Sequence, residues 1–90
     1  MPSAHPPSCP RVVVYGRVGC HLCDDAGVVV TRVCGALREA WTKVSIDDDP
    51  ALLTAYGELI PVVTVDGREV ARYRISDEDL RSALRLPHHS

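Results

Sequence analysis

Cys20-His21-Leu22-Cys23 stands between two segments with different hydrophobic periodicity. A run of mostly β-branched residues, 11–15, precedes it and predicts a buried strand. A helical pattern over about residues 22–40 follows it, and the segment 16–19, rich in glycine, joins the two. Two cysteines with two residues between them at a strand-to-helix junction indicate a thiol redox centre.

The position of Cys20 explains why this arrangement favours redox chemistry. A cysteine at the start of a helix lies over backbone N–H groups that have no partner within the helix, at the positive end of the helix dipole. This environment favours the thiolate, the form that attacks disulfides. Cys23 follows about one helical turn later, so its sulfur can reach back to Cys20. We expect the two to form a reversible disulfide.

A metal site is the main alternative for this pair, because C-x-x-C is also half of a zinc site. The remaining candidate ligands do not form a second C-x-x-C or an H-x₃₋₅-H pair; they are Cys9, Cys34, His5, His21, His88 and His89. The strand–turn–helix setting therefore favours the redox interpretation, and no metal ligand is assigned. Cys34, eleven residues beyond Cys23 on the same helix, is expected to be a buried and unreactive thiol.

Composition limits the function classes. The chain has 90 residues, 46% of them hydrophobic, and a formal net charge of −2 with both signs interspersed. We expect one small monomeric domain that binds neither nucleic acid nor a membrane. The chain has no apolar run of about 20 residues and no pattern typical of a signal peptide. A cytoplasmic location follows as an expectation, and disulfides there are usually transient and catalytic.

The hydrophobic pattern predicts a domain over residues 11–85 between a disordered tail, 1–10, and a short C-terminal tail, 86–90. Strands are expected at 11–15, 42–46, 62–65 and 69–73, and helices at 22–40, 50–56 and 77–84. The order is β-α-β-α-β-β-α. The first β-α-β unit implies two parallel strands, and Asp66-Gly67 predicts an antiparallel hairpin. An α/β fold with a four-stranded mixed sheet and helices on both faces follows.

This order, with C-x-x-C after the first strand and Pro61 just before the third, resembles the thioredoxin fold. It is most similar to the glutaredoxin-like branch, over roughly residues 11–85. The resemblance implies that Cys20 is the nucleophile and Cys23 the resolving cysteine. It also implies a cis peptide bond before Pro61, with the backbone of Ile60 pairing with a bound peptide or thiol within contact distance of Cys20.

Two polar residues near the cysteines are further candidates for the site. Arg17 matches the lysine that often precedes the glutaredoxin motif, and it could stabilise the Cys20 thiolate or bind an anionic substrate group. His21 could lower the thiol pKa when protonated, or carry a proton. The alternative for Arg17 is an arginine in a turn that contacts only solvent. The alternative for His21 is an exposed residue that merely separates the two cysteines.

These features predict a small dithiol thiol–disulfide oxidoreductase that needs no cofactor beyond an external thiol reductant. Its substrate would be a disulfide-containing protein or a small thiol compound, and its electron donor a system such as thioredoxin or glutathione. The family's Gly-Gly before the last helix is replaced by Tyr73-Arg74, which predicts weak binding of glutathione. Two alternatives are a binding or adaptor module with an unused C-x-x-C, and a metal or iron–sulfur carrier through Cys20.

Overall fold

The computed structural model describes residues 10–85, so the predicted tails and Cys9 lie almost wholly outside the described residues. Four strands form one mixed sheet in the order β2-β1-β3-β4. Their bounds are β1 Val12–Gly16, β2 Trp41–Ser45, β3 Val62–Val65 and β4 Arg68–Arg72. β1 pairs with β2 in parallel, whereas β1 with β3 and β3 with β4 are antiparallel. The predicted four-stranded mixed sheet is confirmed.

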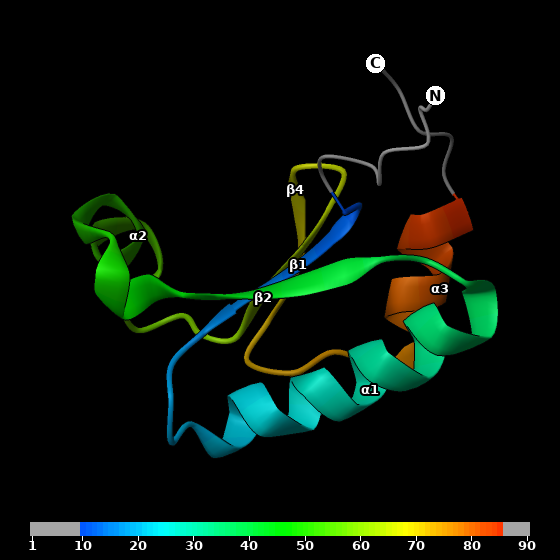
Figure 1. The fold of residues 1–90 in the computed structure, drawn as a ribbon, viewed down its shortest axis with the longest axis horizontal. Helices are drawn as coiled ribbons and strands as arrows, with labels where there is room; N and C mark the ends of the chain where they lie inside the picture. The colour runs from blue at the N-terminus through cyan, green and yellow to red at the C-terminus, as the bar shows by residue number, and fades with distance from the viewer. Residues whose placement is uncertain (1–9, 86–90) are drawn as a thin grey trace, which may run out of the picture.

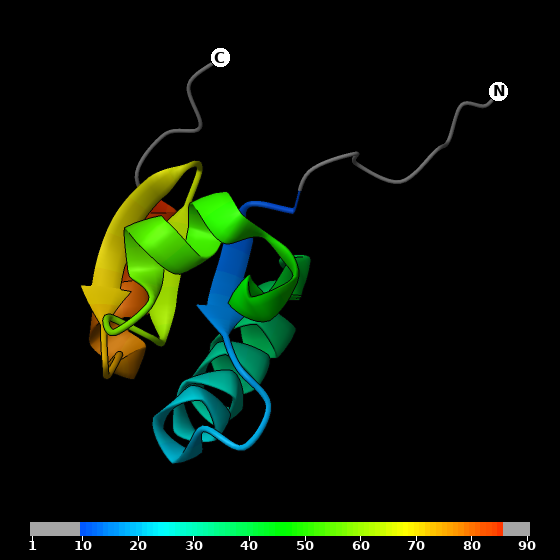
Figure 2. The same ribbon diagram turned by 90° about the vertical axis from the view of Figure 1, so that its left-hand side faces the viewer.

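Helices cover both faces of this sheet. Helices α1, His21–Leu37, and α3, Asp77–Arg85, pack on one face, and the short α2, Pro50–Tyr56, follows the one-turn helix η1, Ile46–Asp48. In Figure 1, α2 lies at the left, away from α1 and α3, and Figure 2 shows it crossing in front of β1. No helix within residues 10–85 combines the length and the hydropathy of a bilayer-spanning segment.

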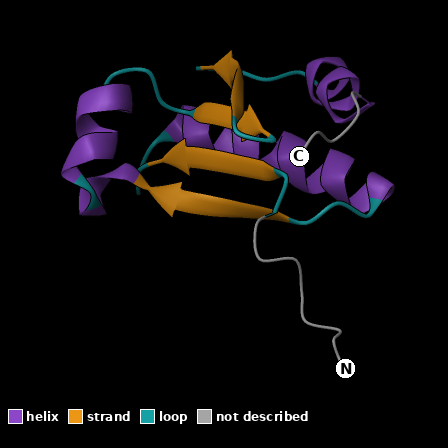
Figure 3. Ribbon diagram, turned by 90° about the horizontal axis from the view of Figure 1, so that it is seen from above, coloured by secondary structure: helices purple, strands orange, loops and turns teal. Residues whose placement is uncertain are grey.

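The alternation of side chains along β1 sets the two faces. Val12 and Val14 are fully buried and belong to the core cluster that α1 and α3 complete with Val30, Val33 and Leu80. Residues between them point to the opposite face because successive side chains of a strand alternate. There the ring of Tyr15 lies 5.0 Å from that of Tyr56 in α2. Figure 3 shows the sheet from above with α1 beneath it.

Predicted and observed elements differ mainly at the end of α1. The helix stops at Leu37 rather than near residue 40, because Arg38 adopts the left-handed conformation with φ of 58°. Its backbone N–H donates to the carbonyls of Cys34 and Gly35, which satisfies acceptors that the helix leaves open. Helix α2 and strand β3 have the predicted bounds, and the other strands are displaced by one residue.

One arginine joins several segments at the end of the sheet where β1 begins. The guanidinium of Arg11 donates to both carboxylate oxygens of Asp66, at 3.0 and 2.9 Å, and to Glu39 at 2.9 Å. It also lies 3.4 Å from the carbonyl oxygen of Leu84 in α3. The hydrogen bond to Asp66 is the largest cause that raises the pKa of Arg11 above its ordinary value. These contacts link β1, the β3–β4 turn, the α1–β2 loop and α3.

We predict that Arg11→Met destabilises the fold by about 1–2 kcal/mol, because it removes a bidentate, charge-assisted pair from partly buried carboxylates. Urea unfolding followed by circular dichroism measures the change. The matched control is Arg32→Met, since Arg32 and Asp77 form an ion pair with side chains 55% and 39% exposed. Exposed pairs contribute at most about 1 kcal/mol. Equal losses in the two variants would contradict the prediction.

Candidate redox site

Cys20 occupies the N-cap position of α1, directly before the first helical residue. Its backbone is extended, with φ of −93° and ψ of 113°, so the helix begins at His21. The backbone N–H of Cys23 donates to the Cys20 sulfur at 3.2 Å. The carbonyl of Cys20 accepts the N–H of Asp24 at 3.0 Å, as the first hydrogen bond of the helix. The Cys20 sulfur therefore lies at the positive end of the helix dipole.

Cys23 is joined to Cys20 by a disulfide, with their Cα atoms 5.1 Å apart. This separation lies within the usual range for disulfides, about 4.4–6.8 Å. The two cysteines differ in exposure: Cys20 is partly exposed, whereas Cys23 is completely buried. Cys20 is therefore the member of the pair that solvent can reach.

Gly16 makes room for the second cysteine, a role that the sequence analysis did not assign. It is the last residue of β1, and a Cβ atom added to it would lie 2.8 Å from the sulfur of Cys23 and 3.1 Å from its Cβ. Any side chain at this position would collide with Cys23. A glycine at the end of a β-branched strand is the signal that could have revealed this close approach.

The Ile60–Pro61 peptide bond is cis, as the resemblance to the glutaredoxin-like branch implied. Val62, the next residue, pairs with Tyr15 in the antiparallel register of β1 and β3. Pro61 therefore lies at the end of the sheet where β1 ends and the turn to the cysteines begins. The carbonyl of Pro61 accepts the backbone N–H of Tyr73 at 2.8 Å, which ties this turn to the end of β4. Contact between Ile60 and Cys20 stays a prediction.

Arg17 and His21, the polar candidates, are both exposed. The Nε atom of Arg17 lies 3.0 Å from a carboxylate oxygen of Asp47 in η1, and both side chains are close to half exposed. The turn that carries Arg17 is thus joined to the segment after β2. Their proposed roles towards the thiolate and the substrate stay predictions. Val18, in the same turn, is 95% exposed beside the redox motif.

Cys34 is buried, with 1% of its surface exposed, which confirms the buried thiol expected from the sequence. Burial, and secondarily the charge of Glu39, raises the pKa of the Cys34 thiol above its usual value. The thiolate is thereby disfavoured, and with it nucleophilic attack. Cys34 follows Cys23 by eleven positions along the helix, about 16 Å, which is too far for a disulfide.

We therefore predict that Cys20 and Cys23 form the one intramolecular disulfide that changes with redox state. Differential alkylation followed by peptide mapping should label these two cysteines only after reduction. Cys34 should become labelled only when the protein is unfolded, because it is buried in the native fold. A dominant Cys20–Cys34 or Cys9–Cys34 bond would be incompatible with this assignment.

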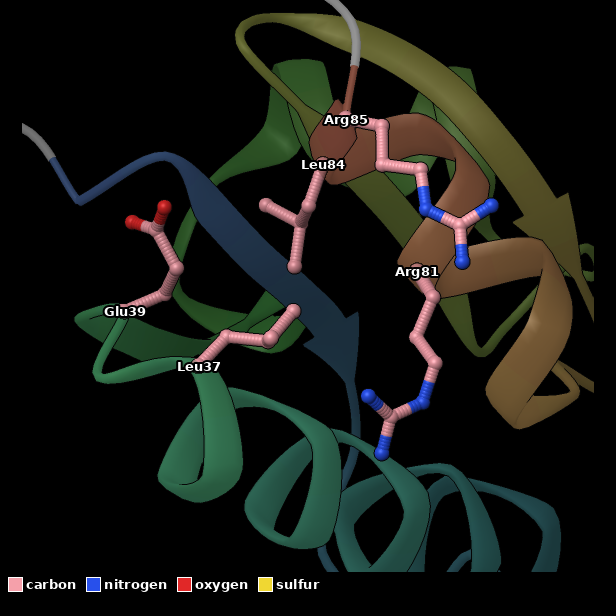
Figure 4. A pocket seen from close by; sticks show the side chains of 5 residues that line it. All are labelled: Leu37, Glu39, Arg81, Leu84 and Arg85. Carbon is pink, nitrogen blue, oxygen red and sulfur yellow. The ribbon is translucent and has the colours of Figure 1, made fainter.

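A metal cluster or a cavity remote from the cysteines could provide another site. Within residues 10–85, no three side chains of the types His, Cys, Asp and Glu come together as a metal would require. A cavity of about 260 Å³ lies between the C-terminal ends of α1 and α3 and is shown in Figure 4; its lining residues are Leu37, Glu39, Arg81, Leu84 and Arg85. The cavity is separated from the cysteines by the length of α1, about 25 Å.

Residues 11–85 match the family described as Glutaredoxin-like domain (DUF836). The chain belongs to this family. Relatives of this glutaredoxin-like domain include uncharacterized proteins of Mycobacterium tuberculosis and Mycobacterium bovis. Each is 25% identical over 80 residues, which cover 83% of this chain and 82% of the relative. These relatives carry no assigned activity in their names, so they establish kinship alone.

Solved structures agree with the family assignment. A structural genomics target protein from X. campestris, determined in solution, is 36% identical over 88% of this chain and 99% of its own, with a TM-score of 0.68. A protein from Nitrosomonas europaea is 25% identical over 87% and 95%, with a TM-score of 0.69. Glutaredoxin C1 from Populus tremula x tremuloides, in its holo form, is 20% identical over 83% and 72%, with a TM-score of 0.59. The thioredoxin-like fold is thereby established.

Proposed function

We propose that this glutaredoxin-like domain is a dithiol thiol–disulfide oxidoreductase. The observation that carries the proposal is the position of the Cys20–Cys23 disulfide at the N-terminus of α1, where the Cys20 sulfur accepts the backbone N–H of Cys23. A hydrogen bond to the sulfur and the helix dipole both favour the thiolate over the thiol. Cys20 is the nucleophile because it is the accessible member of the pair.

The reaction transfers two electrons from the protein dithiol to a substrate disulfide. The Cys20 thiolate attacks one substrate sulfur, so that a mixed disulfide forms and the other substrate sulfur leaves as a thiolate that takes up a proton. Cys23 loses its proton and attacks the Cys20 sulfur, which releases the second substrate thiol. The protein then holds the Cys20–Cys23 disulfide, and an external dithiol reduces it for the next cycle.

Trapping the mixed disulfide tests this mechanism directly. In a Cys23→Ser variant the first step proceeds and the second cannot, so a disulfide-bearing substrate should stay attached to Cys20. Intact-mass spectrometry should show the adduct, and dithiothreitol should remove it. The matched control is Cys20→Ser, which should form no adduct because buried Cys23 is then the only cysteine left in the motif. Absence of an adduct in both variants would instead favour a binding module with an unused motif.

The start of α3 disfavours glutathione as the electron donor. Tyr73 stands at the position of the family's Gly-Gly and adopts φ of 65°, a conformation typical of glycine, while the residue is 46% exposed. The first turn of α3 carries three carboxylates, Asp77, Glu78 and Asp79. The hydroxyl of Ser76 already accepts the N–H of Asp79 at 3.0 Å. An incoming carboxylate would meet a bulky side chain, negative charge and a backbone N–H already in use.

We predict that glutathione with glutathione reductase supports turnover at least about tenfold less efficiently than thioredoxin with its reductase, because of this crowding and charge repulsion. NADPH consumption with a common small disulfide substrate measures both rates. Saturable turnover with glutathione at the thioredoxin rate, lost in Cys20→Ser, would overturn the prediction. A Tyr73→Gly variant should raise the glutathione rate specifically, because it removes the side chain and suits the positive φ.

A further inference from the structure

A surface groove runs from the turn before the cysteines along the outer edge of the sheet. Its first part, about 250 Å³, is lined by Gly16, Arg17, Val18, Lys43 and Ser45. Its second part, about 400 Å³, is lined by Asp24, Gly27, Val28, Thr31, Arg32, Trp41 and Lys43. Lys43 lines both parts, which are therefore neighbours along β2. In Figure 1, β2 passes in front of β1, with α1 below it.

The register of the sheet explains one wall of this edge groove. Trp41, Lys43 and Ser45 alternate along β2 and pair with Val12, Val14 and Gly16 of β1. Because the partners in β1 face α1, the three β2 side chains lie on the α1 side of the sheet as well. The opposite wall is formed by residues of α1 at helical spacing, from Asp24 to Arg32, whose guanidinium is paired with Asp77.

Three features of the edge groove have no evident role in the packing of the domain. A Cβ atom added to Gly27 would meet nothing within 4 Å, so internal packing does not require this helix-weakening residue. Val28 beside it is 60% exposed. Lys43 is exposed and has no ion pair with any residue in the described range 10–85.

Strand β2 offers further binding capacity because it is an edge of the sheet. It pairs with β1 on one side only, so in the described part of the chain its outer backbone N–H and C=O groups have no strand partner. Such an edge can bind an extended peptide as an added strand, while pockets beside the edge bind every second side chain of the peptide. The single charged residue inside β2, Lys43, would then lie beside that peptide.

We propose that this groove binds an extended segment of a protein substrate next to the disulfide that Cys20 attacks. The segment adds to the β2 edge and places two alternate side chains in the groove, an apolar one on Trp41 and Val28 and an acidic one against Lys43. The inference rests on the proposed function and adds a substrate class to it: protein disulfides flanked by an apolar-x-acidic sequence.

The layout of the groove supports this occupant over others. Trp41 and Lys43 lie two residues apart on one face, which matches the spacing of side chains on an added strand. The groove is lined on both sides of the cysteine motif, by Val18, two residues before the first cysteine, and by Asp24, directly after the second, so a bound segment lies next to the redox site. Asp24 on the helical wall repels an acidic group, which confines that group to the Lys43 side of the groove.

Fluorescence of Trp41, the single tryptophan of the chain, provides a direct test. The probes are two short peptides that differ in one residue, one with Leu-Thr-Glu and one with Leu-Thr-Lys, and that carry serine in place of cysteine. Titration of the reduced protein should shift the Trp41 emission, with the glutamate peptide binding about tenfold more tightly than the lysine peptide. No shift with either peptide, or equal affinities, would overturn the proposal.

Variants separate the groove from the redox site. Lys43→Glu should reverse the preference between the two peptides. Gly27→Leu should weaken binding of the glutamate peptide at least about tenfold by filling the groove. Gly35→Leu is the matched control, because a Cβ there also meets nothing within 4 Å and Gly35 does not line the groove. Equal effects of the two leucines would refute the proposal. If wild-type protein reduces a small disulfide yet does not discriminate the peptides, the groove proposal fails while the proposed function stands.

Discussion

Replacing Cys20 by serine is expected to lower the rate of disulfide reduction by about three orders of magnitude or more, because the reaction loses its nucleophile. The hydroxyl of serine stays protonated at neutral pH, and the helix N-terminus cannot make it an equivalent nucleophile. Cys23 cannot substitute, since it is completely buried on the side of α1 that faces Gly16. Stopped-flow measurement of thiolate release from a small aromatic disulfide gives the rate.

Cys34→Ala is the control for this measurement. It removes a buried thiol that lies about 16 Å from Cys23 along the helix, so it should keep the wild-type rate after correction for folded fraction. Cys23→Ser should release the first thiolate at a rate close to that of the wild type and then stop after one equivalent. A Cys20→Ser protein that retained a tenth of the wild-type rate would contradict the assignment of the nucleophile.

Gly16→Ala is expected to destabilise the oxidised protein by about 2–3 kcal/mol, in the upper part of the range for overpacking a core. The added methyl would lie 2.8 Å from the sulfur of Cys23 and 3.1 Å from its Cβ. Neither atom is the end of a flexible side chain, so β1 and the N-terminus of α1 must move apart. Urea unfolding of oxidised and reduced protein measures the loss in each state.

The matched control is the same chemical change in the helix. Gly35→Ala adds a methyl that meets nothing within 4 Å, so it should stabilise the protein by up to about 1 kcal/mol through helix propensity.

Gly16→Ala should also slow formation of the Cys20–Cys23 disulfide, because the displaced Cys23 sulfur no longer lies at bonding distance. Equal stability of Gly16→Ala and wild-type protein would show that Cys23 does not depend on this close approach.

Local sequence was sufficient to predict most of the helices and strands of the fold. The β-branched run before the cysteines and the Asp66-Gly67 turn each restrict the backbone over a few residues, and the strands that they predicted appear within one residue of the predicted bounds. The early end of α1 was not predicted because Arg38 adopts its left-handed conformation without the glycine that usually marks such a position. Its capping bonds to Cys34 and Gly35 depend on the folded helix.

The cysteine pair also shows which features of the site local sequence predicts and which depend on the folded structure. C-x-x-C at a strand-to-helix junction is a local pattern, and it was sufficient to predict the Cys20–Cys23 pair and the N-cap position of Cys20. The different exposure of the two sulfurs depends on what covers Cys23. That cover comes from the end of β1, where Gly16 meets Cys23 across the sheet–helix interface.

Sequence by itself determined the order of helices and strands and the cysteine pair, because each depends on residues that are neighbours in the chain. The cis bond before Pro61 was predicted from the resemblance to the glutaredoxin-like branch, since an X–Pro sequence alone favours the trans form. Tertiary structure alone decided that Gly16 must lack a side chain and that a groove joins β2 to α1. The groove places Val28 beside Lys43, which lies fifteen residues later in the chain. Such contacts arise only when the crossover connection packs α1 against the sheet, and no local pattern specifies which side chains then meet.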